Sequence, residues 1–171
     1  MSRYFPHTPY AEDQPLSHTI LYTHVLTRGL TAGTLIGTAV ATARHYLPSS
    51  SSSSSPKPLL AARVLRASST GALVGVGLSA LATVGRMWGR TEIEWQDRSW
   101  RLMENRGQLR VDDWTYGGMV VAPVITAARG NLGWRPLVGA VGLGSVGGMV
   151  VYLATSAFFK EEKKKGRETE V

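Results

Sequence analysis

Long uncharged stretches alternate with short charged segments along this chain of 171 residues. Four apolar stretches occupy residues 26–47, 64–88, 114–128 and 137–159. A bilayer core about 30 Å thick requires about 20 helical residues, so the first, second and fourth stretches are long enough to cross it. The third contains Pro123 and is shorter, so it is either a short span or a re-entrant or buried helix. The pattern predicts an all-α membrane protein, a small bundle of about four transmembrane helices.

Small residues recur at every fourth position within three of these stretches. Residues four apart lie on one face of a helix. A glycine costs about 1 kcal/mol relative to alanine inside a helix, but in a bilayer small residues allow two helix backbones to approach closely. We therefore predict Gly-rich helix-packing faces at Gly29, Gly33, Gly37, Gly71, Gly75, Ala140, Gly144 and Gly148.

Arginines lie near the ends of the first two predicted spans. A membrane arginine is by default a functional candidate, but a long side chain near a span end can extend its charge to the interface. The second interpretation is favoured, because the two arginines of each stretch are separated by about 24–30 Å of helix. Interfacial charges are expected at Arg28, Arg44, Arg66 and Arg86. Three tryptophans, Trp88, Trp114 and Trp134, lie at ends of the predicted spans. This placement is typical of an aromatic belt at the membrane interface.

The polar segments complete the predicted organisation. An N-terminal arm covers residues 1–18, a Ser-rich linker 48–58, a central loop 89–113 and a charged, mobile tail 160–171, which leaves residues 19–159 as the helical domain. The central loop interleaves charges with tryptophans. It is either a solvated charged loop or an ordered element that docks on another protein. We favour the second, with docking residues at Trp95, Arg98, Trp100, Arg101 and Trp114.

Composition excludes several classes of chemistry. The net charge is +7, but nucleic-acid binding requires a basic patch on a folded surface, and here the lysines cluster in the tail. The absence of cysteine excludes disulfides and thiolate sites, and the four histidines lack metal-ligand spacing. Gly142-Leu-Gly144-Ser-Val-Gly147 matches a dinucleotide fingerprint, but too little chain follows for a nucleotide fold. We expect no catalytic residue, metal, small-molecule substrate, nucleic acid or cofactor, apart from a structural phospholipid.

Two resemblances extend this picture. Four short Gly-rich spans, and an arm without the features of a presequence, resemble the Tim17/Tim22/Tim23-like group of mitochondrial inner-membrane proteins. This group includes protein-import components and a membrane-arm subunit of respiratory complex I. A narrower likeness lies in residues 94–105 (EWQDRSWRLMEN) and 111–114 (VDDW). These segments are similar to fungal accessory membrane subunits of mitochondrial NADH:ubiquinone oxidoreductase, the NUXM type.

The resemblance implies a multi-pass protein of the mitochondrial inner membrane with a non-catalytic, accessory role in complex I of the respiratory chain. Its partners would be the lipid bilayer and other membrane-arm subunits, and the electron transport chemistry of this NADH dehydrogenase would belong to those other subunits. The alternative is a Tim17/Tim22/Tim23-like component of a protein translocase. Four spans place both termini and the central loop on one side, and the excess of Lys and Arg there puts that side in the matrix.

Overall fold

The described residues form an all-helical protein. The computed structural model describes residues 4–47, 60–130 and 133–168, with side chains up to residue 159. No strand occurs within these ranges, so the predicted all-α class is confirmed; the Ser-rich linker at 48–58 lies outside them. The elements in chain order are the short 3-10 helix η1 (Ala11–Asp13), α1 (Ser17–Tyr46), α2 (Leu60–Met87), α3 (Glu92–Glu104), α4 (Arg106–Ala128) and α5 (Trp134–Glu168).

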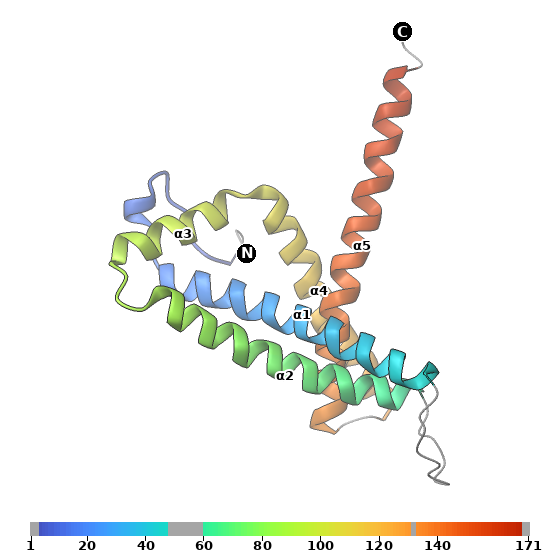
Figure 1. The fold of residues 1–171 in the computed structure, drawn as a ribbon. Helices are drawn as coiled ribbons and strands as arrows, with labels where there is room; N and C mark the ends of the chain where they lie inside the picture. Colours follow the sequence, from blue (N-terminus) through green and yellow to red (C-terminus); the bar gives the residue numbers. More distant parts are fainter. Residues whose placement is uncertain (1–3, 48–59, 131–132, 169–171) are drawn as a thin grey trace.

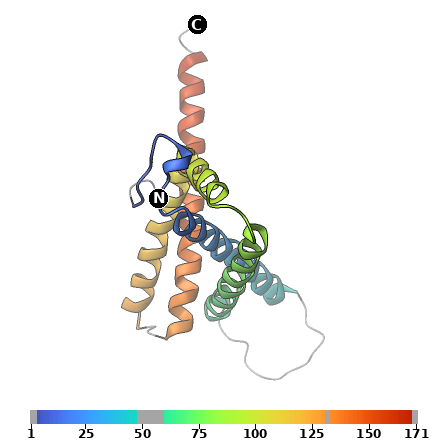
Figure 2. The same cartoon turned by 90° about the vertical axis from the view of Figure 1, so that its left-hand side faces the viewer.

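Two antiparallel helix pairs make up the body of the molecule. Helices α1 and α2 pack along their length, and so do α4 and α5. Figure 1 shows the α1–α2 pair running at a steep angle to α5, which packs against both helices of that pair. The N-terminal arm and α3 cover the end where α1 begins and α2 ends, and Figure 2 shows the same arrangement from the side.

The predicted central loop is wrong in one respect, because most of it is helical. Thr91 begins α3 with a capping box, in which the backbone N–H of Thr91 donates to Glu94 at 3.1 Å. Asn105 ends α3 and begins α4, since its side chain accepts a hydrogen bond from the backbone N–H of Gln108 at 3.1 Å. Such caps satisfy donors that the first turn leaves free. The segment is therefore ordered, as expected, but it is a helical hairpin rather than a loop.

Helix boundaries differ from the predicted spans at several other places. Helix α1 begins at Ser17, well before residue 26, and the third apolar stretch is the second half of α4, which continues through Pro123. The tail was expected to be mobile, but α5 continues to Glu168, because glutamate and lysine are good helix formers. Residues 169–171 lie outside the described ranges.

Among the described residues, two helices are long and apolar enough to cross a membrane. They are α2, over Leu60–Met87, and α5, over Trp134–Phe159. The uncharged stretches of α1 and α4 are shorter, because charged residues interrupt both helices nearer their middles. At 1.5 Å per residue, α5 is about 52 Å long, and its C-terminal part extends beyond the rest of the bundle (Figure 1).

The interior and the exterior of the helix pairs are inverted relative to a water-soluble protein. Most of their buried positions are small or hydroxylated, including Ser68, Thr31, Thr34 and Ser145, whereas Leu78 is 63% exposed. Large aliphatic side chains are exposed on every helix of the two pairs, among them Leu35, Ile36, Leu73, Leu81, Val120, Val124, Val150 and Leu153. A conventional apolar core is confined to the junction of α1, α3 and α4, where Ile20, Met103 and Leu109 meet.

Candidate functional site: helix interfaces, a buried ion pair and a groove

Glycines bring the backbones of α1 and α2 into direct contact. A Cβ added to Gly33 would collide with the carbonyl oxygen of Gly71, and a Cβ on Gly71 would collide with that of Gly33. Gly29 meets Gly75 and Ser79 in the same way, and Gly37 meets Ala67. Because the obstructing atoms are mostly backbone, they cannot move aside as a flexible side chain would. This interface therefore requires the absence of a side chain at each of these positions.

Helix α5 carries two small-residue faces. Gly144 and Gly148 face α4, where added Cβ atoms would collide with the carbonyl oxygens of Gly118 and Trp114. Gly118 was not among the predicted packing residues, although its spacing of four from Ala122 was a usable signal. The second face meets the α1–α2 pair through Gly139, Gly142 and Ser145, while Ala140 is buried.

Hydroxyl groups supplement the contacts between α5 and the α1–α2 pair. The hydroxyl of Thr31 donates to that of Ser145 at 3.1 Å, and Ser68 donates to the carbonyl oxygen of Gly139 at 3.2 Å. Such hydrogen bonds between helices hold membrane bundles together where a hydrophobic driving force is absent.

A buried carboxylate joins α1 to α4. The guanidinium of Arg28 pairs with Asp112, whose side chain is 1% exposed. His24 Nδ1 lies 3.3 Å from the second carboxylate oxygen, and the Gln108 amide donates to the first at 3.2 Å. Arg28 was interpreted as an interfacial charge that extends to the membrane surface. The structure corrects one part of that interpretation, because the guanidinium pairs with a carboxylate of another helix instead of remaining free.

Asp112 was missed because it fell within the predicted loop. It lies two residues before Trp114, at the point where the charged half of α4 gives way to the apolar half. A buried ion pair contributes little net stability, but removal of one partner leaves a buried, unpaired charge. The pair therefore makes the contact between α1 and α4 specific. The other predicted interfacial arginines, Arg44, Arg66 and Arg86, are exposed, as that role requires.

The N-terminal arm and the start of α1 contact the two α3 tryptophans that were predicted to dock a partner. Trp95 is 7% exposed, and the ring of His18 stacks on it at a centroid separation of 3.9 Å. The Trp100 indole N–H donates to the carbonyl oxygen of Thr8 at 3.0 Å. Trp95 therefore has little surface left for a partner, whereas Trp100 is half-buried, and its docking on another protein stays a prediction.

The remaining residues of the predicted docking set do not converge on one surface. Arg101 is exposed and pairs with Asp97, one helical turn away, at 3.0 Å. Arg98 is half-buried on α3. Trp114 is 47% exposed on α4, close to the interface with α5. Of the five residues, Trp114 presents the largest free apolar surface.

Two contacts between a histidine and a glutamate attach the arm and the start of α1 to α3. His18 Nε2 lies 2.8 Å from Glu92, which also accepts a hydrogen bond from the Ser17 hydroxyl at 2.7 Å. The hydrogen bond with His18, together with that from Ser17, lowers the pKa of Glu92 below its ordinary value of 4.5. At the other end of α3, His7 Nε2 lies 3.0 Å from Glu104. Within the described residues, no three His, Asp or Glu side chains converge as metal ligands would.

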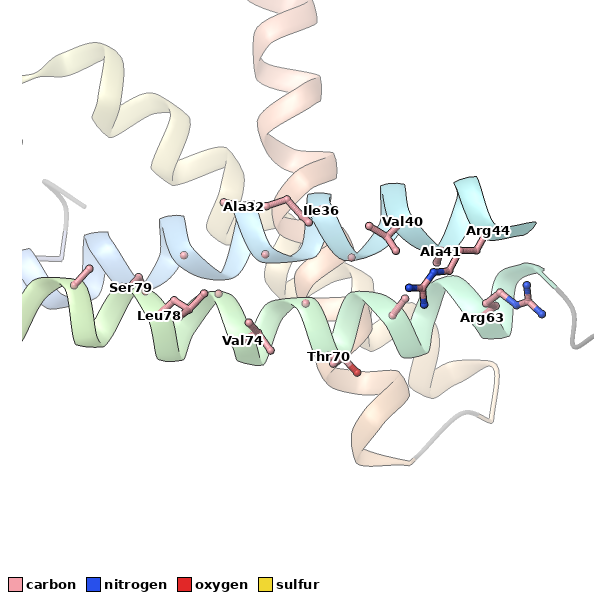
Figure 3. Close-up of a pocket in the computed structure, with 17 residues that line it drawn as sticks. Ala32, Ile36, Val40, Ala41, Arg44, Arg63, Thr70, Val74, Leu78 and Ser79 are labelled. Atoms are coloured by element: carbon pink, nitrogen blue, oxygen red, sulfur yellow. The ribbon is translucent and has the colours of Figure 1, made fainter. Parts of the chain in front are cut away.

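An apolar groove runs along the outer side of the α1–α2 pair. Its volume is about 1000 Å³, and the helix-packing glycines form its floor. Ile36 and Val40 from α1 and Val74 and Leu78 from α2 line it, as Figure 3 shows. The guanidinium groups of two residues, Arg44 and Arg63, lie at one end, where α1 ends and α2 begins (Figure 3).

Comparison with known proteins provides a family but no described activity. No curated protein matches the chain. One family model, described as a protein of unknown function (DUF1757), matches residues 11–160. The matched segment begins at η1 and ends just beyond the apolar part of α5, so it contains both helix pairs, the buried ion pair and the groove. The protein therefore belongs to the DUF1757 family.

Proposed function

We propose that this protein is a non-catalytic, multi-pass scaffold of the mitochondrial inner membrane and an accessory subunit of the membrane arm of complex I. The observation that carries the membrane part of the proposal is the inverted packing. Glycine, serine and threonine fill the interior of the helix pairs, and aliphatic side chains face outward. In water this exterior would be an aggregation surface, whereas in lipid it is the expected one.

Four crossings are the topology we propose. The ends that join α1 to α2 and α4 to α5 lie toward the bottom of Figure 1, and α3 and the C-terminal end of α5 lie toward the top. This alternation of helix ends supports four crossings, in which the α1–α2 pair would be strongly tilted relative to α5. The charged N-terminal half of α4, which pairs with Arg28 through Asp112, would lie at or just below one interface.

The scaffold role is supported by how the polar side chains are used. Asp112, Glu92 and Glu104 each pair with a residue from another part of the chain. A group held in an ion pair between elements is engaged in stabilising the fold. We infer that this protein contributes shape and helix surfaces to its assembly, while other subunits carry out the electron transport.

The assignment to complex I rests on the similarity of residues 94–105 and 111–114 to its fungal accessory subunits. The first segment forms α3, and the second contains Asp112 and Trp114. Native electrophoresis of detergent-solubilised mitochondrial membranes tests it. The protein is expected to migrate with NADH dehydrogenase activity, and its deletion is expected to lower the amount of the full-size complex. Migration in a separate complex without that activity would contradict the assignment.

A component of a protein translocase is the second candidate. The observation that favours it is the open α1–α2 groove, because translocases must present apolar surface to segments in transit. Co-migration with import machinery in the same electrophoresis experiment would support this alternative over complex I.

In either assembly, we propose that the termini face the matrix. Protease treatment of intact mitoplasts that carry a tag at Val171 tests this: the tag should be protected, and digestion from the outer face would contradict it.

A further inference from the structure

The α1–α2 groove combines an apolar channel with a positively charged end. Its floor is backbone, because Gly33, Gly37 and Gly71 have no side chains to fill it. Its walls are exposed aliphatic side chains, of which Ile36 is 65% exposed. An open groove of about 1000 Å³ in a membrane-embedded protein must be filled, since neither water nor a void is favourable against such walls. Its occupant must therefore be apolar along most of its length.

The charged end requires the occupant to carry an anion. Arg44 lies in the last turn of α1, and Arg63 lies in the first turn of α2. No carboxylate of the described residues pairs with either guanidinium, in contrast to Arg28. Helix α2 is a candidate span that begins at Leu60, so in the proposed membrane location Arg63 would lie near the headgroups. Guanidinium groups bind phosphate oxygens through charge-assisted, often bidentate hydrogen bonds.

We propose that this groove binds one anionic phospholipid, whose phosphate is held by Arg44 and Arg63 and whose acyl chain lies along the glycine floor. This inference rests on the proposed membrane location. A helix from another protein, or a second copy of this chain, would match the apolar walls equally well. Only the lipid accounts for both features, because its anionic headgroup and its acyl chain are joined at the depth where the arginines lie.

Native mass spectrometry of the full chain, purified in detergent, tests this proposal. The probes are phosphatidylglycerol and phosphatidylcholine with identical acyl chains, and glycerol 3-phosphate as a headgroup without chains. We expect one phosphatidylglycerol to be retained in preference to phosphatidylcholine. The double variant Arg44→Gln/Arg63→Gln should weaken its retention about tenfold, the loss expected when one or two charge-assisted hydrogen bonds are removed. Arg86→Gln, which removes an exposed charge at the other end of α2, should leave retention unchanged.

A second pair of variants tests the apolar part of the α1–α2 groove without changing any charge. Val40→Trp should fill the groove and lower retention of phosphatidylglycerol, whereas Leu35→Trp, at an exposed position of α1 outside the groove, should not. Equal retention of the two lipids, or a preference that survives the double arginine variant, would overturn the proposal. Tight binding of glycerol 3-phosphate would reduce the site to a simple anion site. If the purified chain is a dimer and Val40→Trp converts it to a monomer, the groove is the interface with a second copy, and the lipid proposal is overturned.

Alkaline carbonate extraction of the membranes, performed first, separates the two levels of inference. Release of the chain into the soluble fraction would contradict the membrane location, and the lipid site with it. Resistance to carbonate without a preference for phosphatidylglycerol would contradict only the lipid site.

Discussion

The α1–α2 pair and the cap formed by the N-terminal arm and α3 use opposite means of holding two segments together. In the pair, glycine backbones touch and almost no large side chain is buried. In the cap, an indole hydrogen bond and a His7–Glu104 contact join the arm to α3, and the stacked ring of His18 and its contact with Glu92 join the start of α1 to α3, around a small apolar core. The first arrangement suits lipid, where close packing drives helix association, and the second suits water. The contrast agrees with the proposed membrane topology, in which the bilayer boundary would pass between these two regions.

Asp112 lies where the two regions meet, so its removal is expected to have the largest effect. Asp112→Ala leaves the Arg28 guanidinium, whose side chain is 26% exposed, without its carboxylate. Because Arg28 is only partly buried, we expect a cost of about 2–3 kcal/mol, below the 3–5 typical when a fully buried charge is left unpaired. The reporter is the unfolding midpoint of the purified chain in detergent. Asp97→Asn is the matched control, because it breaks an exposed i,i+4 pair on α3 and should cost less than about 1 kcal/mol.

The double variant Arg28→Met/Asp112→Leu sharpens this prediction. It replaces both charges with apolar groups and should recover most of the lost stability, since a buried pair has little net value. If Asp112→Ala unfolds no more readily than Asp97→Asn, the ion pair does not lock α1 to α4.

Gly33→Leu tests the glycine contact of the α1–α2 pair. The new side chain would collide with the backbone of Gly71 and force the helices apart, and overpacking of this kind costs about 1–3 kcal/mol. Gly77→Leu is the control, because a Cβ at that position of α2 would meet nothing within 4 Å. We expect the first variant, but not the second, to lower the amount of protein retained in its native assembly. Equal retention of both would mean that close backbone contact is unnecessary.

Trp100→Ala tests whether the cap closes on the protein's own arm. Loss of the ring removes the hydrogen bond to Thr8 and the contact with His7. For this half-buried ring we expect a cost of about 1–2 kcal/mol, below the 3–5 typical of a fully buried one. Limited proteolysis should then cleave the arm before Leu16 more rapidly. Trp88→Ala, at a ring that is 80% exposed, should leave the cleavage rate unchanged. Unaltered arm cleavage combined with loss from the assembly would instead support a partner at Trp100.

The smallest expected effect is a pH dependence of the cap. The hydrogen bond with His18 lowers the pKa of Glu92 in the folded chain below its ordinary value of 4.5. The unfolded state therefore binds the proton more tightly, and the stabilisation is present above about pH 4.5 and is lost as the pH falls through the folded pKa. Arm cleavage should increase over that acidic range, and Glu92→Gln should weaken this dependence. The same slope in both proteins would exclude Glu92 as its source.

Local patterns in the sequence predicted much of the architecture. Uncharged stretches indicated helices, and spacings of four indicated which faces of α1, α2 and α5 would carry small residues, because both depend only on the helical repeat. The junction of α3 and α4 falls at Asn105-Arg106-Gly107, a turn-forming composition. The helical character of the central segment was missed because its interleaved charges and tryptophans were interpreted as an ordered docking loop.

Only the tertiary structure decided which segments meet. The spacing of Gly144 and Gly148 could not reveal that they face Gly118, while Gly139 and Gly142 face the other pair. Likewise, nothing local in the sequence connects Arg28 with Asp112, 84 positions away, or Trp100 with Thr8. The physical reason is that helical periodicity is a property of neighbouring residues. The partner of a face depends on how two helix pairs cross, and so on contacts between residues that are far apart in the chain.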